Sequence, residues 1–381
     1  MIHYTSKLPN SGTSIFAVMG KLANEHNAIN LGQGFPDYPI SDKLKKLVVD
    51  YVQRDKNQYA PMPGILELRE IISKKYFSSY QRKIDPESEV TIHAGATQAI
   101  FMAIMAFVKR DDEVLIVEPA YDCYLPTILL AEAKPISVSV RAPDYRIDWN
   151  EVNDRISDKT RMIIINNPHN PIGTTLSKED LETLQEIVKD TNIIVLSDEV
   201  YEHLVYDEVR HQSVLAYPEL ANQSIAVYSF GKTFHATGWK MGYSIAPAHL
   251  MNEIRNLHQW NVFSVNSFLQ YALADFLVDP IEYQKLPAFF QRKRDLFQEA
   301  LKDSKLKPLS CSGTYFQLYE YSEMSHLPDL EFAKWLVTEH GVASIPISPF
   351  YKHGSNDRVV RFCFAKEDQT LISAAHRLSR I

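Results

Sequence analysis

The chain has 381 residues, of which 45% are hydrophobic, so it can bury a substantial core as one large domain or two of ordinary size. Its formal net charge is -7 and its basic residues are scattered singly, which argues against nucleic-acid and membrane-surface partners. The three cysteines lie far apart and no zinc-ligand spacing occurs, so the sequence predicts neither a disulfide framework nor a metal site.

The N-terminal segment, residues 1–12, has no apolar run of the kind that marks a secretory signal. The longest apolar helical segment, residues 99–107, is too short to span a bilayer, and we expect a buried core helix there. Both features favour a cytoplasmic protein.

Short apolar runs alternate with helical segments in the middle of the chain. The helical segment 177–190 has Ser177 as its expected N-cap and Asp180 in its first turn. Such runs are typical of buried parallel strands joined through helices. The four runs span residues 113–119, 161–167, 192–199 and 224–230.

After about residue 280 the pattern changes to a smaller α+β unit. Its expected elements are a helix at 291–303, a strand at 314–321, a helix at 330–341, a strand at 357–365 and a final helix. The sequence therefore predicts an α/β fold, with a mainly parallel sheet between helices and a smaller α+β domain.

Polar residues follow each of the four apolar runs. The runs are followed by "EPAYDCY", "NNPHNPIG", "SDEVY" and "SFGK". Ligands bind beyond the carboxyl ends of the strands in a doubly wound sheet. We therefore expect amide, carboxylate, phenol, hydroxyl and amine groups to meet at one edge of the sheet.

Lys232, in "SFGKTFHATGWK", allows three chemical interpretations. A phosphate loop requires a glycine where this chain has Ala226, and the acidic strand precedes the lysine instead of following it. An acylating Ser229 with Lys232 as its base also requires downstream motifs that the chain lacks. The third interpretation is an amine that condenses with pyridoxal phosphate, and a solvated loop lysine is the plain alternative.

Nine ordered segments from about residue 30 to 365 resemble class I pyridoxal-phosphate aminotransferases of fold type I. The segments are most similar to those of methionine, glutamine and kynurenine aminotransferases. They are "LGQGFPDYP", "NQYAPMPG", "EPAYDCYLP", "NNPHNPIG", "SDEVYEHLVYD", "SFGKTFHATGWKMGY", "LHQWNVFS", "ISPFY" and "RFCFA".

The resemblance implies amino acid and 2-oxo acid substrates, which react in turn, and a homodimer with composite active sites. It also implies an N-terminal arm with part of the small domain at 1–42, a large cofactor-binding domain at 43–280 and a small C-terminal domain at 281–381. A cofactor-binding regulator built on the same scaffold is the alternative outside enzymology.

The resemblance also assigns roles around the cofactor ring. Lys232 is the expected attachment point of the cofactor and the group that moves the substrate proton, and Asp198 is the expected partner of the ring nitrogen. Tyr201 is expected to donate to the ring phenolate oxygen, and Asn170 to contact both that oxygen and the substrate carboxylate. Tyr121 is expected to stack on the ring, although alone it would more often be a core tyrosine.

The cofactor phosphate is expected to bind the backbone N–H groups of Ala96 and Thr97 at a helix N-terminus. Ser229 is expected to add a hydroxyl and Lys240 a charge. Lys240 differs from the arginine that is commoner in this class and provides a point charge in place of a planar fork. Tyr59 is expected to reach the phosphate from a second subunit.

Arg361 is the expected clamp for the substrate carboxylate, and a surface arginine in a strand is its plain alternative. Gly34 is expected to let the backbone approach that carboxylate. No arginine occurs between residues 255 and 292, where aspartate-specific relatives bring a second arginine.

An apolar or aromatic side chain is therefore expected for the substrate, with methionine favoured. The residues implied for its pocket are Phe16, Phe263 and Phe350. The alternative is a kynurenine- or glutamine-type aminotransferase with cysteine-conjugate β-lyase activity.

Overall fold

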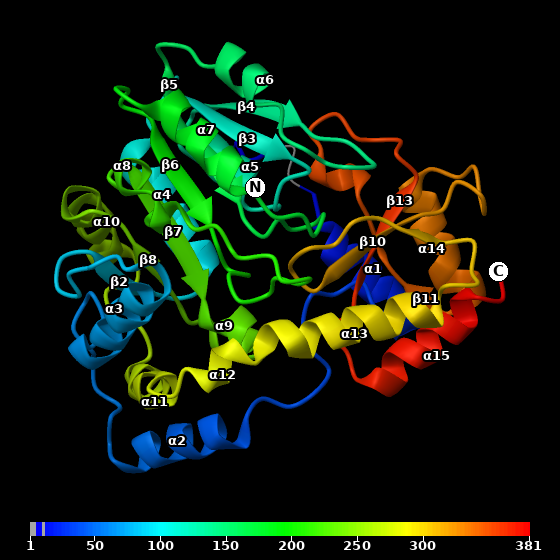
Figure 1. Ribbon diagram of the computed structural model, residues 1–381, viewed down its shortest axis with the longest axis horizontal. Helices are drawn as coiled ribbons and strands as arrows, with labels where there is room; N and C mark the ends of the chain where they lie inside the picture. Colours follow the sequence, from blue (N-terminus) through cyan, green and yellow to red (C-terminus); the bar gives the residue numbers. More distant parts are fainter. Residues whose placement is uncertain (1–4, 10–11) are drawn as a thin grey trace.

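The structure is a computed structural model and describes residues 5–9 and 12–381. The predicted N-terminal arm therefore lies partly outside the described residues. Figure 1 shows a large unit of helices and strands beside a smaller unit. The long helix α13 (Leu286–Ala300) runs below both units in this view. No helix in the described ranges is long and apolar enough to cross a membrane.

Among the described residues, seven strands form the central sheet. Neighbouring strands are parallel from β4 through β7, whereas β8 is antiparallel to both of its neighbours. The predicted α/β fold with a mainly parallel sheet is confirmed. In sheet order the strands are β2 (Val90–His93), β8 (Gly242–Ile245), β7 (Ser224–Ser229), β6 (Ile194–Asp198), β5 (Thr160–Asn166), β3 (Glu113–Glu118) and β4 (Lys134–Ser139).

Both faces of this sheet are buried, which explains why its strands are continuous apolar runs. Val114 and Ile116 of β3 pack with one set of helices, and Leu115 and Val117 pack on the opposite side. The first face is covered by α4 (Ala96–Phe107), α5 (Tyr124–Leu130) and α10 (Ala248–Asn261), and the second by α3 (Leu66–Tyr80) and α7 (Lys178–Val188). The predicted buried core helix at 99–107 is therefore part of α4.

Helix α7 begins where its capping signal predicts. The Ser177 hydroxyl accepts from the Asp180 N–H, and the Asp180 carboxylate accepts from the Ser177 N–H. This capping box satisfies two N–H groups that have no partner within the helix.

The smaller unit contains an antiparallel sheet in the order β12-β13-β10-β9. Its strands are β9 (Lys307–Pro308), β10 (Phe316–Glu320), β12 (Ile345–Pro346) and β13 (Val359–Cys363), and its helices include α14 (Asp329–His340) and α15 (Asp368–Leu378). The N-terminal α1 (Ile15–Glu25) packs on α14, and β1 (Ile29–Asn30) pairs with β11 (Val342–Ala343). These contacts support the division at residues 42 and 280, which stays a prediction.

The remaining helices are short or lie at the margins of the large unit. They are α2 (Asp42–Gln53), α6 (Trp149–Asp154), α8 (Pro218–Ala221), α9 (Phe230–Thr233), α11 (Ser267–Leu277) and α12 (Ile281–Gln284), with short 3-10 turns at Val214–Ala216, Thr237–Trp239 and Ser348–Phe350. Helices α6 and α8 pack on α7, and α11 packs on α2 and α3.

Candidate active site

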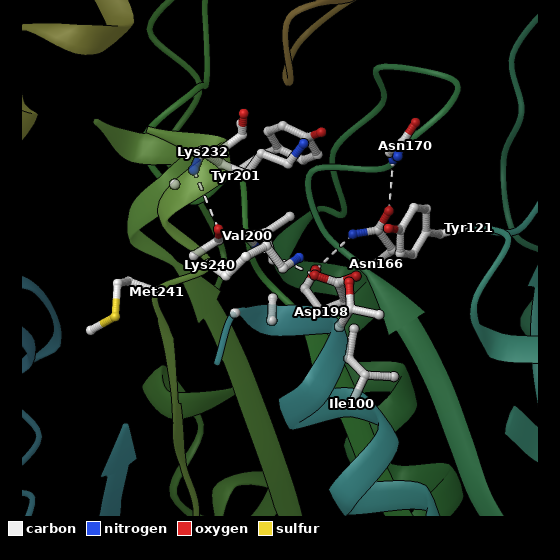
Figure 2. Close-up of a pocket in the computed structure, with 16 residues that line it drawn as sticks. Ile100, Tyr121, Asn166, Asn170, Asp198, Val200, Tyr201, Lys232, Lys240 and Met241 are labelled. Atoms are coloured by element: carbon white, nitrogen blue, oxygen red, sulfur yellow. Dashed lines mark hydrogen bonds between the residues drawn. The ribbon is translucent and has the colours of Figure 1, made fainter. Parts of the chain in front are cut away.

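The carboxyl ends of the parallel strands meet at one pocket with about 660 Å³ of empty space (Figure 2). Asn166 ends β5, Asp198 ends β6 and Ser229 ends β7, so the sheet itself brings these side chains to one edge. Nine of the residues expected to bind the cofactor line this pocket: Ala96, Thr97, Tyr121, Asn170, Asp198, Tyr201, Ser229, Lys232 and Lys240.

One end of the pocket is the N-terminus of α4. Gly95 precedes this helix with a φ of 85°, a conformation that favours glycine, and it has no side chain with which to cap the first turn. A Cβ at Gly95 would lie 3.3 Å from the Lys240 Nζ, so the amine lies close to this turn. The N–H groups of Ala96 and Thr97 and the Lys240 charge together suit an anion.

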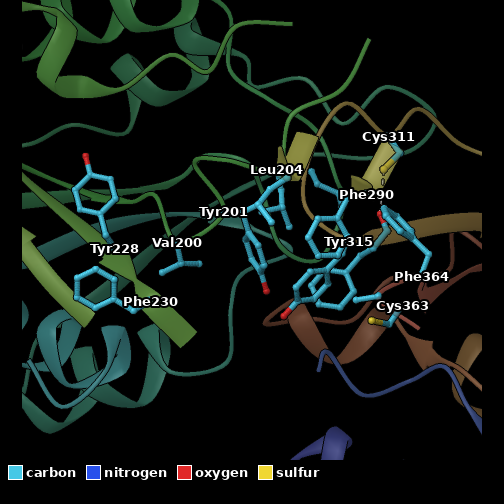
Figure 3. Close-up of a cluster of buried hydrophobic side chains, with 14 of the residues drawn as sticks. Val200, Tyr201, Leu204, Tyr228, Phe230, Phe290, Cys311, Tyr315, Cys363 and Phe364 are labelled. Carbon is cyan, nitrogen blue, oxygen red and sulfur yellow. Dashed lines mark hydrogen bonds between the residues drawn. The ribbon is translucent and has the colours of Figure 1, made fainter. Parts of the chain in front are cut away.

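Lys232 lies on α9, directly after β7, and its amine lies beside a pair of aromatic rings. Its Nζ is 5.8 Å from the ring centroids of both Tyr201 and Tyr315, which face each other edge to face (Figure 3). The Nζ also donates to the Gly34 carbonyl at 3.4 Å. Burial lowers the pKa of this amine to about 8. Lys232 is therefore not a solvated loop lysine.

Asp198 is buried at the base of the pocket. Its carboxylate accepts from the Tyr124 hydroxyl at 2.6 Å and from the Val200 N–H at 3.3 Å. Burial nevertheless raises the pKa of this carboxyl to about 6, because these two hydrogen bonds only partly offset the loss of water. A cationic partner in the pocket would restore the ionised form.

Arg361 lies on β13 of the smaller unit and is 1% exposed, so its interpretation as a surface arginine is wrong. Its Nη1 donates to Asn170 Oδ1 at 2.7 Å and its Nη2 donates to the Gly32 carbonyl at 3.1 Å. Burial lowers the pKa of its guanidinium to about 10. Its Nε is buried without a hydrogen-bond partner among the described residues. The structure thus joins Arg361 and Asn170 into one polar site.

Phe16 and Phe350 lie next to this guanidinium, with ring centroids 5.7 Å apart. The guanidinium carbon is 5.2 Å from the Phe16 centroid and 5.9 Å from the Phe350 centroid. Gly34 lies nearby, where a Cβ would come within 2.7 Å of the Phe316 ring, so a side chain has no room there.

Six of the expected site residues are not among those that line this pocket. Arg361, Gly34, Phe16 and Phe350 lie together beside it, whereas Tyr59 and Phe263 form a separate exposed pair. Tyr59 is 83% exposed and Phe263 is 47% exposed, and the centroids of their rings are 5.6 Å apart. Neither residue lies among those that line the pocket.

Three residues that shape the site were not predicted from the sequence. Tyr124 donates to Asp198, and the Tyr315 hydroxyl donates to the Gly34 carbonyl at 2.7 Å. The Asn166 amide donates to the Asp198 carbonyl at 2.8 Å and accepts from the Asn170 N–H at 2.7 Å. Tyr124 and Asn166 belong to the strand-end segments "EPAYDCY" and "NNPHNPIG", so position after a strand was a signal for both. Tyr315 had no such signal.

Comparison with known proteins agrees with this geometry. The family model for aminotransferase class I and II matches residues 26–378. The methionine aminotransferase of Escherichia coli is 45% identical over 377 residues, with 99% of this chain and 98% of that protein covered. Human kynurenine–oxoglutarate transaminase 1 is 32% identical, with 94% of each chain covered.

Solved structures show the same likeness. The crystal structure of an Escherichia coli protein with a methionine aminotransferase function superposes with a TM-score of 0.98 at 45% identity, and each chain is covered completely. The N-succinyldiaminopimelate aminotransferase of Mycobacterium tuberculosis superposes with a TM-score of 0.95 at 34% identity, covering 99% of this chain and 100% of that one. The chain is a transaminase enzyme and belongs to the class I and II aminotransferase family.

Proposed function

We propose that this protein is a pyridoxal-phosphate aminotransferase that moves the amino group of a neutral apolar or aromatic L-amino acid, methionine favoured, to a 2-oxo acid. The observation that carries the proposal is the convergence of a half-buried amine, Lys232, and a buried carboxylate, Asp198, in one pocket with an uncapped helix N-terminus. The Arg361 guanidinium lies beside this pocket through its contact with Asn170.

The chemistry of these groups fits the cofactor. Burial raises the pKa of the Asp198 carboxyl, and a cationic partner such as a protonated ring nitrogen would stabilise its ionised form. The N-terminus of α4, with Ser229 and Lys240, suits a phosphate, and Tyr121 offers a ring for stacking. Tyr201 and Asn170 provide the polar contacts assigned to the phenolate oxygen.

The bound cofactor supplies an electron sink for the bond electrons of the substrate α-carbon. Lys232 provides the proton transfer: the lowering of its pKa to about 8 raises the fraction of neutral amine near neutral pH well above that of an ordinary lysine. The Nζ can therefore accept the α-proton of the substrate. The paired rings of Tyr201 and Tyr315 border the amine on one side and restrict where it can move.

Arg361 and Asn170 bind the substrate carboxylate in this proposal. The guanidinium is already fixed by two hydrogen bonds, and its free Nε remains to be satisfied. A charge-assisted hydrogen bond to a carboxylate contributes about 1.5–3 kcal/mol, which selects α-amino acids over simple amines.

The substrate side chain is proposed to lie against Phe16 and Phe350, which favours apolar or aromatic groups. The likeness to a methionine aminotransferase at 45% identity supports methionine. The kynurenine transaminases are less similar and support the alternative activity more weakly. Discrimination among such side chains is about 1–3 kcal/mol per methylene, so several amino acids are expected to react.

A homodimer is also part of the proposal. Tyr59 and Phe263 form an exposed aromatic pair outside their own pocket, which supports a role in the pocket of a second copy. Large exposed aromatic side chains that touch each other are typical of an interaction surface.

Lys232→Ala tests the assignment directly. The variant is expected to lose both the visible absorbance of the lysine-bound cofactor and turnover, because Lys240, the other lysine in the pocket lining, lies at the N-terminus of α4. Lys189→Ala, on the surface after α7, is the matched control and is expected to keep both. Persistence of the visible band and of turnover in Lys232→Ala would overturn the assignment.

A panel of amino acids tests the substrate. Methionine, phenylalanine, tyrosine, glutamine, kynurenine and aspartate are each added without an oxo acid, and the loss of the visible band is followed. Methionine is expected to react fastest and aspartate slowest. Pyruvate release from a cysteine conjugate measures the β-lyase alternative.

A further inference from the structure

A chain of polar side chains, in which Ser244, His93 and His258 are buried and Gln98 is half-buried, lies behind the first turn of α4. The Ser244 hydroxyl is 2.8 Å from His93 Nε2, and His93 Nδ1 is 3.0 Å from Gln98 Oε1. Gln98 Nε2 is 3.2 Å from both His258 Nδ1 and Asn261 Oδ1. Gln98 therefore joins β2, β8 and α10 to the N-terminus of α4.

The backbone fixes the direction of this chain. The Ala94 N–H donates to Gln98 Oε1 at 3.2 Å, so the amide oxygen faces His93 and the amide nitrogen faces His258. His93 must then carry its proton on Nδ1 and accept from Ser244 at Nε2. His258 accepts at Nδ1 and carries its proton on Nε2.

Both imidazoles remain neutral, so each ring keeps one donor nitrogen and one acceptor nitrogen. Burial lowers the pKa of His258 to about 4 and that of His93 well below its ordinary value. The rings pack edge to face with centroids 5.0 Å apart. A neutral chain with a single hydrogen-bond direction holds one conformation of the Gln98 side chain.

Gln98 also occupies a special place in its helix. Gly95 provides no capping side chain, so the N–H groups of Ala96 and Thr97 remain free for a ligand. Gln98 is the third helical residue and reaches back to the Ala94 N–H, in the manner of a capping box. A Cβ on Gly242 would lie 2.8 Å from the Ala96 nitrogen, so β8 packs closely against this turn.

We propose that Gln98 is a positioning residue that fixes the Ala96 and Thr97 N–H groups and thereby sets the affinity of the site for the cofactor phosphate. This inference rests on the proposed function. Gln98 acts through the backbone: it does not line the pocket, whereas Ala96 and Thr97 do.

The test compares pyridoxal phosphate with pyridoxal, which lacks the phosphate. The dissociation constants of both are measured by titrating the cofactor-stripped enzyme, for the natural protein and for Gln98→Met, whose side chain has a similar length. The variant is expected to bind pyridoxal phosphate about tenfold more weakly, because the phosphate contacts lose their alignment. Its affinity for pyridoxal is expected to remain within about twofold.

Gln223→Met is the matched control. This half-buried glutamine also joins backbone segments, donating to the Val188 carbonyl at 3.0 Å and to the Ile193 carbonyl at 2.9 Å, but it does not line the pocket. It is expected to leave the ratio of the two dissociation constants unchanged, even where it lowers the unfolding temperature.

If Gln98→Met does not fold, His258→Met removes one of the two acceptors of Gln98 Nε2, the buried one, and tests the same chain of hydrogen bonds. An unchanged ratio of the two dissociation constants in the folded variant would overturn the proposal, whether both ligands bind as before or both bind more weakly by the same factor. Failure of the natural protein to bind either ligand would instead overturn the proposed function.

Discussion

The buried carboxylate of Asp198 destabilises the cofactor-free protein, yet the proposed function requires it as the partner of the ring nitrogen. Its carboxyl is 3% exposed, and burial raises its pKa from 3.8 to about 6. A shift of about two units corresponds to about 3 kcal/mol of destabilisation for the ionised form without a cation. The pKa of this carboxyl is higher in the folded protein than in the unfolded chain. Its contribution to the free energy of unfolding is therefore most favourable below about pH 4 and is lost as the pH rises through about 6.

Asp198→Asn is therefore expected to have opposite effects on stability and on binding. The cofactor-free variant is expected to unfold at a higher temperature than the natural protein at pH 7, with the difference shrinking toward pH 4. Its affinity for pyridoxal phosphate is expected to fall at least tenfold, because the ring nitrogen loses its anion. Thermal unfolding across this pH range and a cofactor titration measure the two effects. A less stable cofactor-free variant at pH 7 would contradict the electrostatic account.

Tyr124 offers a second test at the residue scale. Its hydroxyl donates to Asp198 at 2.6 Å and stabilises the ionised carboxylate. Tyr124→Phe is expected to weaken cofactor binding by about tenfold, since a hydrogen bond to a charged group contributes about 1.5–3 kcal/mol. Tyr145→Phe is the control, because the Tyr145 hydroxyl is buried without a partner among the described residues. Equal cofactor dissociation constants for Tyr124→Phe and the natural protein would exclude this role.

At the scale of elements, the ends of the strands position the polar side chains of the pocket, and the N-terminus of α4 adds backbone N–H groups. Helix α7 lies outside the pocket and illustrates how local sequence signals stabilise a helix. Ser177→Ala removes the capping hydroxyl and is expected to lower the free energy of unfolding by about 1 kcal/mol, measured in urea. Thr183→Ala, on the exposed side of the same helix, is expected to change it by less than about 0.5 kcal/mol. A Ser177→Ala effect no larger than this control would show that the capping box contributes little.

At the scale of the whole molecule, the proposed dimer makes each pocket depend on two chains. Lys232→Ala removes the pocket amine of its own chain, and Tyr59→Ala removes a side chain expected to serve the partner. Each homodimer is expected to have low activity. A mixed dimer would contain one pocket with both changes and one pocket with neither.

Mixing the two variants is therefore expected to restore activity above that of either variant alone. The measurement is the transamination rate before and after unfolding and refolding the two variants together. A rate equal to the average of the two homodimers would indicate that Tyr59 serves its own chain or no site at all.

The sequence by itself determined the strands β3, β5, β6 and β7, the cap of α7 and the placement of Lys232 and Asp198 after strands. Local hydrophobic runs and capping residues encode these features because they depend on near neighbours in the chain. The strand ends in the smaller unit were predicted less accurately. A strand was expected at residues 314–321, whereas β10 spans Phe316–Glu320.

Only the tertiary structure decided the contacts between distant segments. It inserted the antiparallel β8 between β2 and β7, and it buried Arg361 against Asn170, 191 residues away in the chain. It also paired Tyr124 with Asp198 and assembled the His93–Gln98–His258 chain. Such contacts arise when the sheet and the smaller unit pack together, and no local pattern of residues records which partners will then meet.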